Sequence, residues 1–265
     1  MLKKRIIPVM LWKDVGLVKG VGFDSWRRTG SILPQIRVYN LRCVDELILL
    51  DISATPDGRE PDYETVRDVA PECFVPLTVG GGIRTVDHVR NLLLAGADKV
   101  SMNSGAFDEP ELITAIARRF GSQCVVVSID ARRTAAGTYE CFSRSGTSAT
   151  GKSPVDWAVE AERRGAGEIL LTSIERDGSM SGYDLELIQM VSAAVRIPVI
   201  AGGGAGTYGH LLEAIMVGGA SAAAAASMFQ FTQQTPLEAK EYLAARGVPV
   251  RRFRPKDKAA TYSLA

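Results

Sequence analysis

The sequence Leu-Thr-Val-Gly-Gly-Gly at residues 77–82 recurs in modified form as Val-Ile-Ala-Gly-Gly-Gly at residues 199–204. Pro76 precedes the first copy, and Pro198 precedes the second copy 122 positions later. In both copies an apolar run ends in three glycines, and a helical pattern follows. The sequence therefore predicts that the chain is a duplication of a half of about 120 residues.

Other parts of the two halves correspond as well. Residues 45–50 match residues 167–172, and residues 100–104 match residues 223–227. Glycines at the C-terminal end of a strand allow backbone N–H groups to approach an anion closely. Two such sites predict a ligand with two phosphates, because phosphate sites of this kind are common in barrels. The alternative is that each glycine run is only a tight strand-to-helix turn.

Composition limits the classes of function. The chain has 265 residues and a net charge of +1, which gives no bulk electrostatic reason to bind nucleic acid or an anionic membrane. The N-terminal apolar stretch is too short for a signal peptide, and no apolar run reaches membrane-spanning length. His88 and His210 fall in predicted outer helices, so we expect no metal and no cofactor. The cysteines are scattered and form no C-x-x-C pair, which predicts a reducing, cytoplasmic compartment. They are Cys43, Cys73, Cys124 and Cys141.

Apolar runs alternate with helical patterns along the chain. The predicted strands are 5–11, 46–52, 73–79, 98–102, 124–130, 168–172, 198–201 and 220–225. The predicted helices are 31–43, 62–70, 85–95, 109–120, 154–164, 184–194, 208–217 and 237–246. Eight such units predict one (βα)₈ barrel over residues 1–250, with half-barrels at about 1–122 and 123–250. An open doubly wound sheet is the alternative fold. The basic tail, 251–265, lacks periodicity, and we expect it to be disordered.

Two segments interrupt this alternation. Residues 12–30 are rich in glycine and basic side chains, which predicts a long loop that is either a functional lid or a disordered surface loop. Residues 131–152 are polar, and residues 138–143 alternate in the manner of a hairpin insertion.

Polar side chains are predicted at the C-terminal ends of the strands, where the active sites of barrels lie. They are Asp51, Asn103, Ser104, Asp130, Thr172, Asp177 and Ser227. Asp130 is the sharpest candidate for acid–base work, and a helix or loop cap is its alternative role. Aligning the first strand with residues 124–130 places Leu11 opposite Asp130, so only one half supplies a carboxylate at this position.

Charged side chains are predicted at the other rim of the barrel. Four strand starts carry charges of alternating sign that could converge around the axis. They are Arg5, Glu46, Lys99 and Glu168. Such a set is either a stabilising network of ion pairs or the gate of a passage through the barrel.

These residues together resemble the cyclase subunit of imidazole glycerol phosphate synthase, over about residues 1–250. The resemblance rests on Thr-Val-Gly-Gly-Gly at 78–82, Ala-Asp-Lys-Val-Ser at 97–101, the stretch 163–174 and Arg-Asp-Gly at 176–178. It implies a two-phosphate substrate and a partner glutaminase that docks at the bottom of the barrel, contacts Asp98 and releases ammonia. The ammonia would cross the charged gate and travel along the barrel axis. Lys19 matches a lysine of a mobile loop that signals substrate occupancy.

The resemblance also implies roles for individual residues. The phosphate-binding residues would be Gly82, Asn103 and Ser104 in one half, and Gly178, Gly203, Gly204, Ala226 and Ser227 in the other. Together with Asp51, Thr172 and Asp177, chosen from their predicted strand-end positions, the candidate catalytic positions are Leu11, Lys19 and Asp130. The family uses two aspartates as acid and base. One matches Asp130, and the other falls on Leu11.

This departure leaves three hypotheses for function. The chain resembles a divergent paralogue that passes ammonia on, together with a glutaminase and a sugar-amidating synthetase, in the biosynthesis of surface polysaccharides. A true cyclase of histidine biosynthesis, in which Asp51 or Asp177 compensates for Leu11, is the alternative enzyme. A non-catalytic sensor that binds a phosphate ligand and regulates a glutaminase is the third hypothesis.

Overall fold

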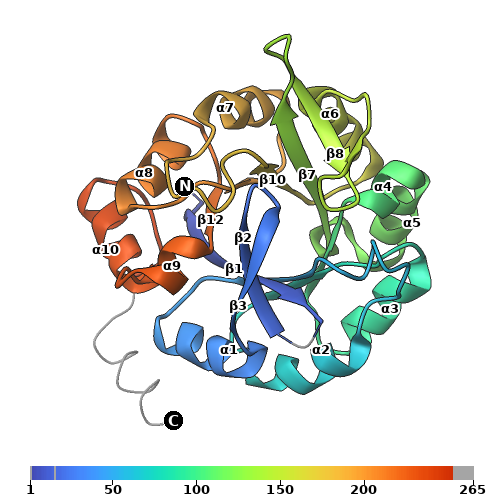
Figure 1. Cartoon of the computed structure of the whole chain (residues 1–265), viewed down its shortest axis with the longest axis horizontal. Helices are drawn as coiled ribbons and strands as arrows, with labels where there is room; N and C mark the ends of the chain where they lie inside the picture. The colour runs from blue at the N-terminus through green and yellow to red at the C-terminus, as the bar shows by residue number, and fades with distance from the viewer. Residues whose placement is uncertain (1, 15, 253–265) are drawn as a thin grey trace.

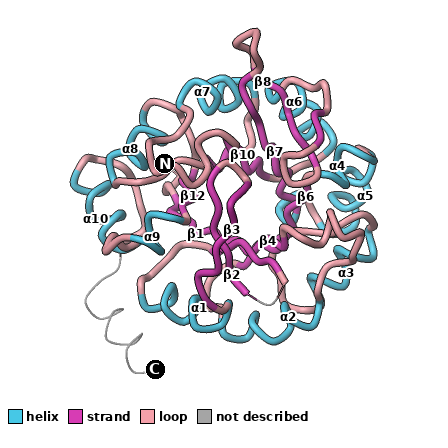
Figure 2. Tube along the Cα trace, viewed as in Figure 1, coloured by secondary structure: helices cyan, strands magenta, loops and turns pink. Residues whose placement is uncertain are grey.

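The computed structural model describes residues 2–14 and 16–252. Eight parallel strands surround a central axis, and helices cover the outside (Figures 1 and 2). The barrel strands are β1 (Arg5–Lys13), β4 (Leu47–Asp51), β5 (Leu77–Gly80), β6 (Lys99–Met102), β7 (Val125–Arg133), β10 (Glu168–Ser173), β11 (Val199–Gly202) and β12 (Ala222–Ala225). The predicted barrel is therefore confirmed.

Two pairings close the sheet. Strand β12 pairs in parallel with β1, with Arg5 opposite Ala222, and β7 pairs in parallel with β10, with Asp130 opposite Thr172. A doubly wound sheet has two open edges, whereas here every barrel strand has a neighbour on both sides. The alternative fold is therefore excluded.

One principal helix follows each barrel strand in the outer layer. These helices are α1 (Ile32–Leu41), α2 (Tyr63–Val69), α3 (Val86–Leu94), α5 (Glu111–Phe120), α6 (Pro154–Arg164), α7 (Leu185–Ala194), α8 (Tyr208–Met216) and α10 (Pro236–Ala245). The predicted N-cap Thr85 accepts a hydrogen bond from the amide of His88, and Thr207, 122 positions later, accepts one from the amide of His210. None of the helices within the described ranges is both long and apolar enough to cross a membrane.

Strand alternation divides the buried side chains into two cores, because neighbouring residues of a strand face opposite sides of the sheet. The larger core lies between the strands and the helices and contains Ile6 and Val127. The smaller core lies inside the barrel. It consists of Ile7, Ile48, Val126, Leu170, Ile200, Ala222 and Ala224. The inward row of β1 therefore runs from Arg5 through Ile7 to Leu11.

The expectation of a loop at residues 12–30 is wrong. Strand β1 continues to Lys13, and β2 (Gly16–Val21) and β3 (Asp24–Gly30) form an antiparallel hairpin on it. This hairpin lies across the mouth of the barrel (Figure 1). Leu17 and Val18 are buried there, which explains why a segment so rich in glycine and charge is ordered as strand.

Other boundaries differ from the expectations in smaller ways. The hairpin insertion is confirmed, because β8 (Tyr139–Ser143) pairs antiparallel with β7 and is followed by β9 (Ser148–Ala149). The third barrel strand begins at Leu77, since a 3₁₀ helix, η1 (Ala70–Glu72), and a short loop precede it. The short helices α4 (Ser104–Asp108) and α9 (Ser227–Phe231) and the 3₁₀ helix η2 (Ser122–Cys124) are additional elements. Residues 253–265 of the expected tail lie outside the described residues.

Candidate functional site

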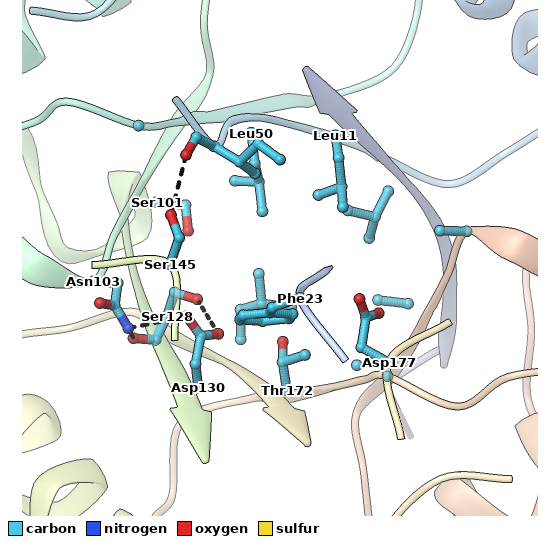
Figure 3. Close-up of a pocket in the computed structure, with 18 of the residues that line it drawn as sticks. Leu11, Phe23, Leu50, Ser101, Asn103, Ser128, Asp130, Ser145, Thr172 and Asp177 are labelled. Atoms are coloured by element: carbon cyan, nitrogen blue, oxygen red, sulfur yellow. Dashed lines mark hydrogen bonds between the residues drawn. The ribbon is translucent and has the colours of Figure 1, made fainter. Parts of the chain in front are cut away.

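A pocket opens at the C-terminal ends of the barrel strands (Figure 3). Its volume is about 1210 Å³ when the space open to solvent is included. The hairpin β2–β3 contributes Lys19, Phe23 and Trp26 to its wall.

All the predicted residues of this rim line the pocket. They are Leu11, Lys19, Asp51, Gly82, Asn103, Ser104, Asp130, Thr172, Asp177, Gly178, Gly203, Gly204, Ala226 and Ser227. The fold thus brings together residues from both halves of the chain, while their individual roles remain predictions.

Asp130 follows Val126 and Ser128 in the row of β7 side chains that faces the barrel axis, and it lies at the pocket end of this row. The amide of Asn103 donates to Asp130 Oδ2 at 3.2 Å, and the Ser128 hydroxyl donates to Asp130 Oδ1 at 3.4 Å. Burial, together with the negative charge of Asp177, raises the pKa of Asp130 to about 7. A carboxyl group with that pKa can both give and take a proton near neutral pH.

Leu11 points into the pocket from the side opposite Asp130 (Figure 3). Its place follows from the alternation of β1, in which Arg5, Ile7 and Val9 face the same way. Leu50 and Phe23 also line the pocket, so leucine here extends an apolar wall. The side chain carries no proton that could be transferred, and the acid–base asymmetry expected from the sequence is therefore part of the folded site.

Lys19 and Asp177 also line the pocket, close enough for the charge of each to act on the pKa of the other. Burial lowers the pKa of the Lys19 ammonium to about 8, and the nearby Asp177 carboxylate opposes this shift. Burial raises the pKa of Asp177, and the charge of Lys19 opposes that shift. The amide of Gly22 donates to the backbone carbonyl of Asp177 at 2.9 Å, so the tip of the hairpin rests on the loop that holds Asp177.

The Asp51 side chain stabilises the turn that follows β4. Its Oδ1 accepts hydrogen bonds from the amides of Ser53 and Ala54 at 2.9 and 3.0 Å and from the Ser53 hydroxyl at 2.8 Å. Its Oδ2 lies 3.4 Å from Arg59 Nη1. This carboxylate is committed to holding the loop after β4, which makes it a poor substitute for an acid at Leu11.

The contact with Thr172 accounts for glycine at the first position of the second glycine run, Gly202. A Cβ at Gly202 would lie only 2.9 Å from Thr172 Oγ1. The absence of a side chain at Gly202 thus keeps the Thr172 hydroxyl at the pocket wall, where Figure 3 shows it beside Asp130.

The opposite rim carries the expected ring of ion pairs. Arg5 lies 2.6 Å from Glu46 and 3.0 Å from Glu168, and Lys99 lies 3.0 Å from Glu46 and 2.8 Å from Glu168. The four side chains are 10–19% exposed, so solvent screens these pairs only in part. Each carboxylate bridges both cations, and the ring is closed. The inner apolar core separates it from the pocket.

Asp98 lies on the same rim and is exposed. Its Oδ2 accepts a hydrogen bond from the amide of Leu77 at 2.8 Å, which fixes the start of β5. Its exposure puts it at the surface where a partner was expected.

Several residues of the pocket were missed by sequence reasoning. Phe23, Thr55 and Ser145 line it from three different loops or turns. The Ser145 hydroxyl donates to the carbonyl of Ile52 at 3.1 Å, across 93 positions of sequence. Strand periodicity gives no signal for such contacts, because all three residues lie outside the barrel strands.

The fold and the pocket define the class of protein: a (βα)₈ barrel with a polar ligand site at the C-terminal ends of its strands and a charged ring at the other end. A family model described as "Histidine biosynthesis protein" matches residues 5–235. The chain belongs to this family, which supports the resemblance inferred from its motifs. Among the residues described, no group of three or more His, Cys, Asp or Glu side chains is placed to hold a metal ion.

Proposed function

We propose that this chain is the ammonia-accepting, synthase-type subunit of a glutamine amidotransferase complex. In this proposal a glutaminase docks on the rim that carries Asp98, and ammonia passes the ion-pair ring and moves along the barrel axis to a phosphorylated ligand in the pocket. The observation that carries the proposal is the closed ring of four charges in line with the pocket. A gate on a passage through the barrel would have to lie at this position.

Leu11 favours a paralogue over an ordinary cyclase. Asp130 has the pKa of a general acid or base, but Leu11 and its apolar neighbours Leu50 and Phe23 supply no titratable group on their side of the pocket. We therefore infer that the chain supports the amidation of a sugar, together with a synthetase that activates it, as in surface-polysaccharide biosynthesis. Asp177 lies in the same pocket and raises the pKa of Asp130, which keeps a true cyclase as the second candidate.

The two candidates differ in turnover with free ammonium. We expect the purified chain to convert the formimino-carboxamide ribonucleotide substrate of cyclases at least 10²-fold more slowly than an ordinary cyclase, because losing one acid or base costs about 10²–10⁴-fold in rate. Leu11→Asp should restore part of the rate. The measurement is substrate loss by absorbance with excess ammonium at alkaline pH, and Leu11→Asn, which adds polarity without a titratable group, is the control. Wild-type turnover within about tenfold of a cyclase would favour the second candidate.

Docking of the glutaminase can be tested separately from chemistry. We expect Asp98→Lys to weaken binding of the glutaminase at least tenfold, because it reverses the charge of an exposed side chain on the proposed interface. Asp98→Asn should weaken binding less, since its side-chain oxygen can still accept from the amide of Leu77. Asp108→Lys, on the exposed end of α4 near the other rim, is the matched control. Equal effects of the charge reversals at positions 98 and 108 would place the interface elsewhere.

A further inference from the structure

Two lysine side chains are almost fully buried in the described part of the chain. They are Lys19 and Lys240, with exposures of 4% and 2%. Burying an ammonium ion is costly unless acceptors surround it. Lys240 has such acceptors, because it donates to the carbonyl of Cys43 and to Asp45. Among the residues described, the Lys19 nitrogen forms no hydrogen bond and no ion pair, and Asp177 acts on it only through its charge.

Close packing of the hairpin places Lys19 at the pocket. Lys19 lies on β2, opposite Arg27 on β3. A Cβ at the neighbouring Gly20 would lie only 2.8 Å from the Trp26 ring, and a Cβ at Gly178 would collide with the carbonyl oxygen of Gly20. The strand therefore packs directly against Trp26 and against the turn that follows Asp177. This packing buries the stem of Lys19, while its side chain still lines the pocket.

An amine in this position is a nucleophile. Burial lowers the pKa of Lys19 to about 8, and the charge of Asp177 opposes this shift. An ordinary lysine has a pKa of about 10.4, so at pH 7 the Lys19 amine is neutral on the order of 10²-fold more often. A neutral amine has a free lone pair on nitrogen, and desolvated lysines of this kind react with carbonyl groups.

The pocket also supplies groups that can move protons. The negative charge of Asp177 acts on both Lys19 and Asp130, so the three side chains form one electrostatic cluster. Burial raises the pKa of Asp130 to about 7, and this carboxyl group therefore carries a proton in part of the molecules at neutral pH. Condensation of an amine with a carbonyl group needs such an acid, because the carbonyl oxygen must leave as water.

A buried hydroxyl group indicates the kind of carbonyl compound. Ser101 lines the pocket, and its Oγ is buried without a hydrogen-bond partner in the described ranges. Such a group is costly unless a ligand satisfies it. Thr172 adds a second hydroxyl to the wall. A compound that carries hydroxyl groups beside its carbonyl group would match this lining.

From this arrangement we propose that Lys19 forms an imine with the carbonyl group of an open-chain aldose or ketose bound in the pocket. The Lys19 nitrogen bonds to the carbonyl carbon, and the oxygen takes the proton that the nitrogen loses. This hydroxyl group leaves as water with a proton from Asp130, and the remaining N–H proton passes to the Asp177 carboxylate. Amine and carbonyl become imine and water, with no oxidation or reduction. The activity goes beyond the proposed function, because it needs neither a glutaminase nor ammonia.

Reductive trapping of the full wild-type chain tests this proposal. The probes are glyceraldehyde 3-phosphate, an aldose, and dihydroxyacetone phosphate, a ketose. Borohydride converts an imine to a stable amine, and peptide mapping by mass spectrometry locates the added mass. We expect at least one probe to modify Lys19 at least tenfold faster than Lys13 at pH 7, because Lys13 is only half-buried at the end of β1 and serves as the internal reference. Modification of Lys19 should level off above pH 8, whereas that of an ordinary lysine goes on rising toward pH 10.

Variants test the role of each group. Lys19→Arg, which keeps the charge without the nucleophile, should reduce the total adduct to the level of the other lysines, and Lys13→Arg should leave the Lys19 adduct unchanged. Asp130→Asn should slow modification of Lys19 at least tenfold, the lower range for loss of a general acid being about 10². Asp108→Asn, at an exposed aspartate of α4, is the matched control and should change the rate by less than threefold.

Three outcomes would contradict the inference. Equal rates at Lys19 and Lys13 would show that the pocket does not activate the amine. Absence of an adduct at Lys19 with both probes would rule out the imine, and this result needs no variant. An unchanged rate in Asp130→Asn would remove Asp130 from the proposed step. None of these results depends on a partner subunit, so each leaves the ammonia-accepting role to be decided by its own experiments.

Discussion

Asp130→Asn is expected to stabilise the folded protein at pH 8 while removing its acid–base group. Burial raises the pKa of Asp130 from 3.8 to about 7. The folded state therefore holds this proton more tightly than the unfolded state. Stability from this group is complete below about pH 4 and is lost as the pH rises through 7. The loss amounts to about 4 kcal/mol, since each pKa unit corresponds to about 1.4 kcal/mol.

Denaturant unfolding of wild type and variant at pH 4.5 and pH 8 measures this effect. The variant should gain several kcal/mol at pH 8 and little at pH 4.5, because asparagine keeps an acceptor for Asn103 or Ser128 and never carries a charge. Asp51→Asn, at another aspartate that lines the same pocket, is the matched control. It should lose about 1 kcal/mol, since Asp51 accepts hydrogen bonds from two backbone amides and a hydroxyl. A destabilised Asp130→Asn at pH 8 would contradict the raised pKa.

The second large effect is expected at Lys240, in α10. Its ammonium donates to the carbonyl of Cys43 and to Asp45 Oδ1, the latter at 2.9 Å. Asp45 Oδ2 accepts from the amide of Ile6 at 2.9 Å, so the pair joins the last helix to the start of the first strand. Both side chains are almost fully buried, with exposures of 2% and 6%.

Lys240→Met should therefore lower the free energy of unfolding by about 3–5 kcal/mol, because it leaves the Asp45 carboxylate buried without its cation. Adding Asp45→Asn should recover part of the loss, since asparagine still accepts from Ile6 and carries no charge. Arg37→Met provides the exposed comparison. Arg37 pairs with Glu72 at 3.1 Å with exposures of 60% and 39%, and the cost should stay below about 1 kcal/mol. Similar losses at both sites would show that burial of the Lys240 pair contributes nothing.

Much of the fold was predictable from periodicity. The apolar runs that became β4, β7 and β10 are long and regular, and their alternation also fixes which side chains face the axis. The hairpin β2–β3 was missed because its glycines and basic residues hide the pattern that buries Leu17 and Val18. Helices α4 and α9 each span five residues, which is too short for a helical period to be recognised.

The sequence predicted which residues line the pocket, but it did not predict the hydrogen bonds that they make there. A repeat can place Ser104 and Ser227 at corresponding positions, but the bond between Ser104 and Arg144 depends on a turn 40 residues away. In the same way, the position of Asp51 at a strand end suggested chemistry. Its engagement with Ser53 and Arg59 became visible only in the folded loop.

The two ends of this barrel are far enough apart for residues at one end to be substituted without changing the other. Residues 5 and 11 share the inward row of β1 and lie roughly 20 Å apart at about 3.3 Å per residue. Apolar side chains of the inner core line the interval between them. A substitution at the mouth therefore leaves the charged end unaltered, so a gene duplicate can acquire new chemistry while it keeps an inherited partner. Under the proposed function, Leu11 would be such a change at the mouth, with the ion-pair ring kept at the far end.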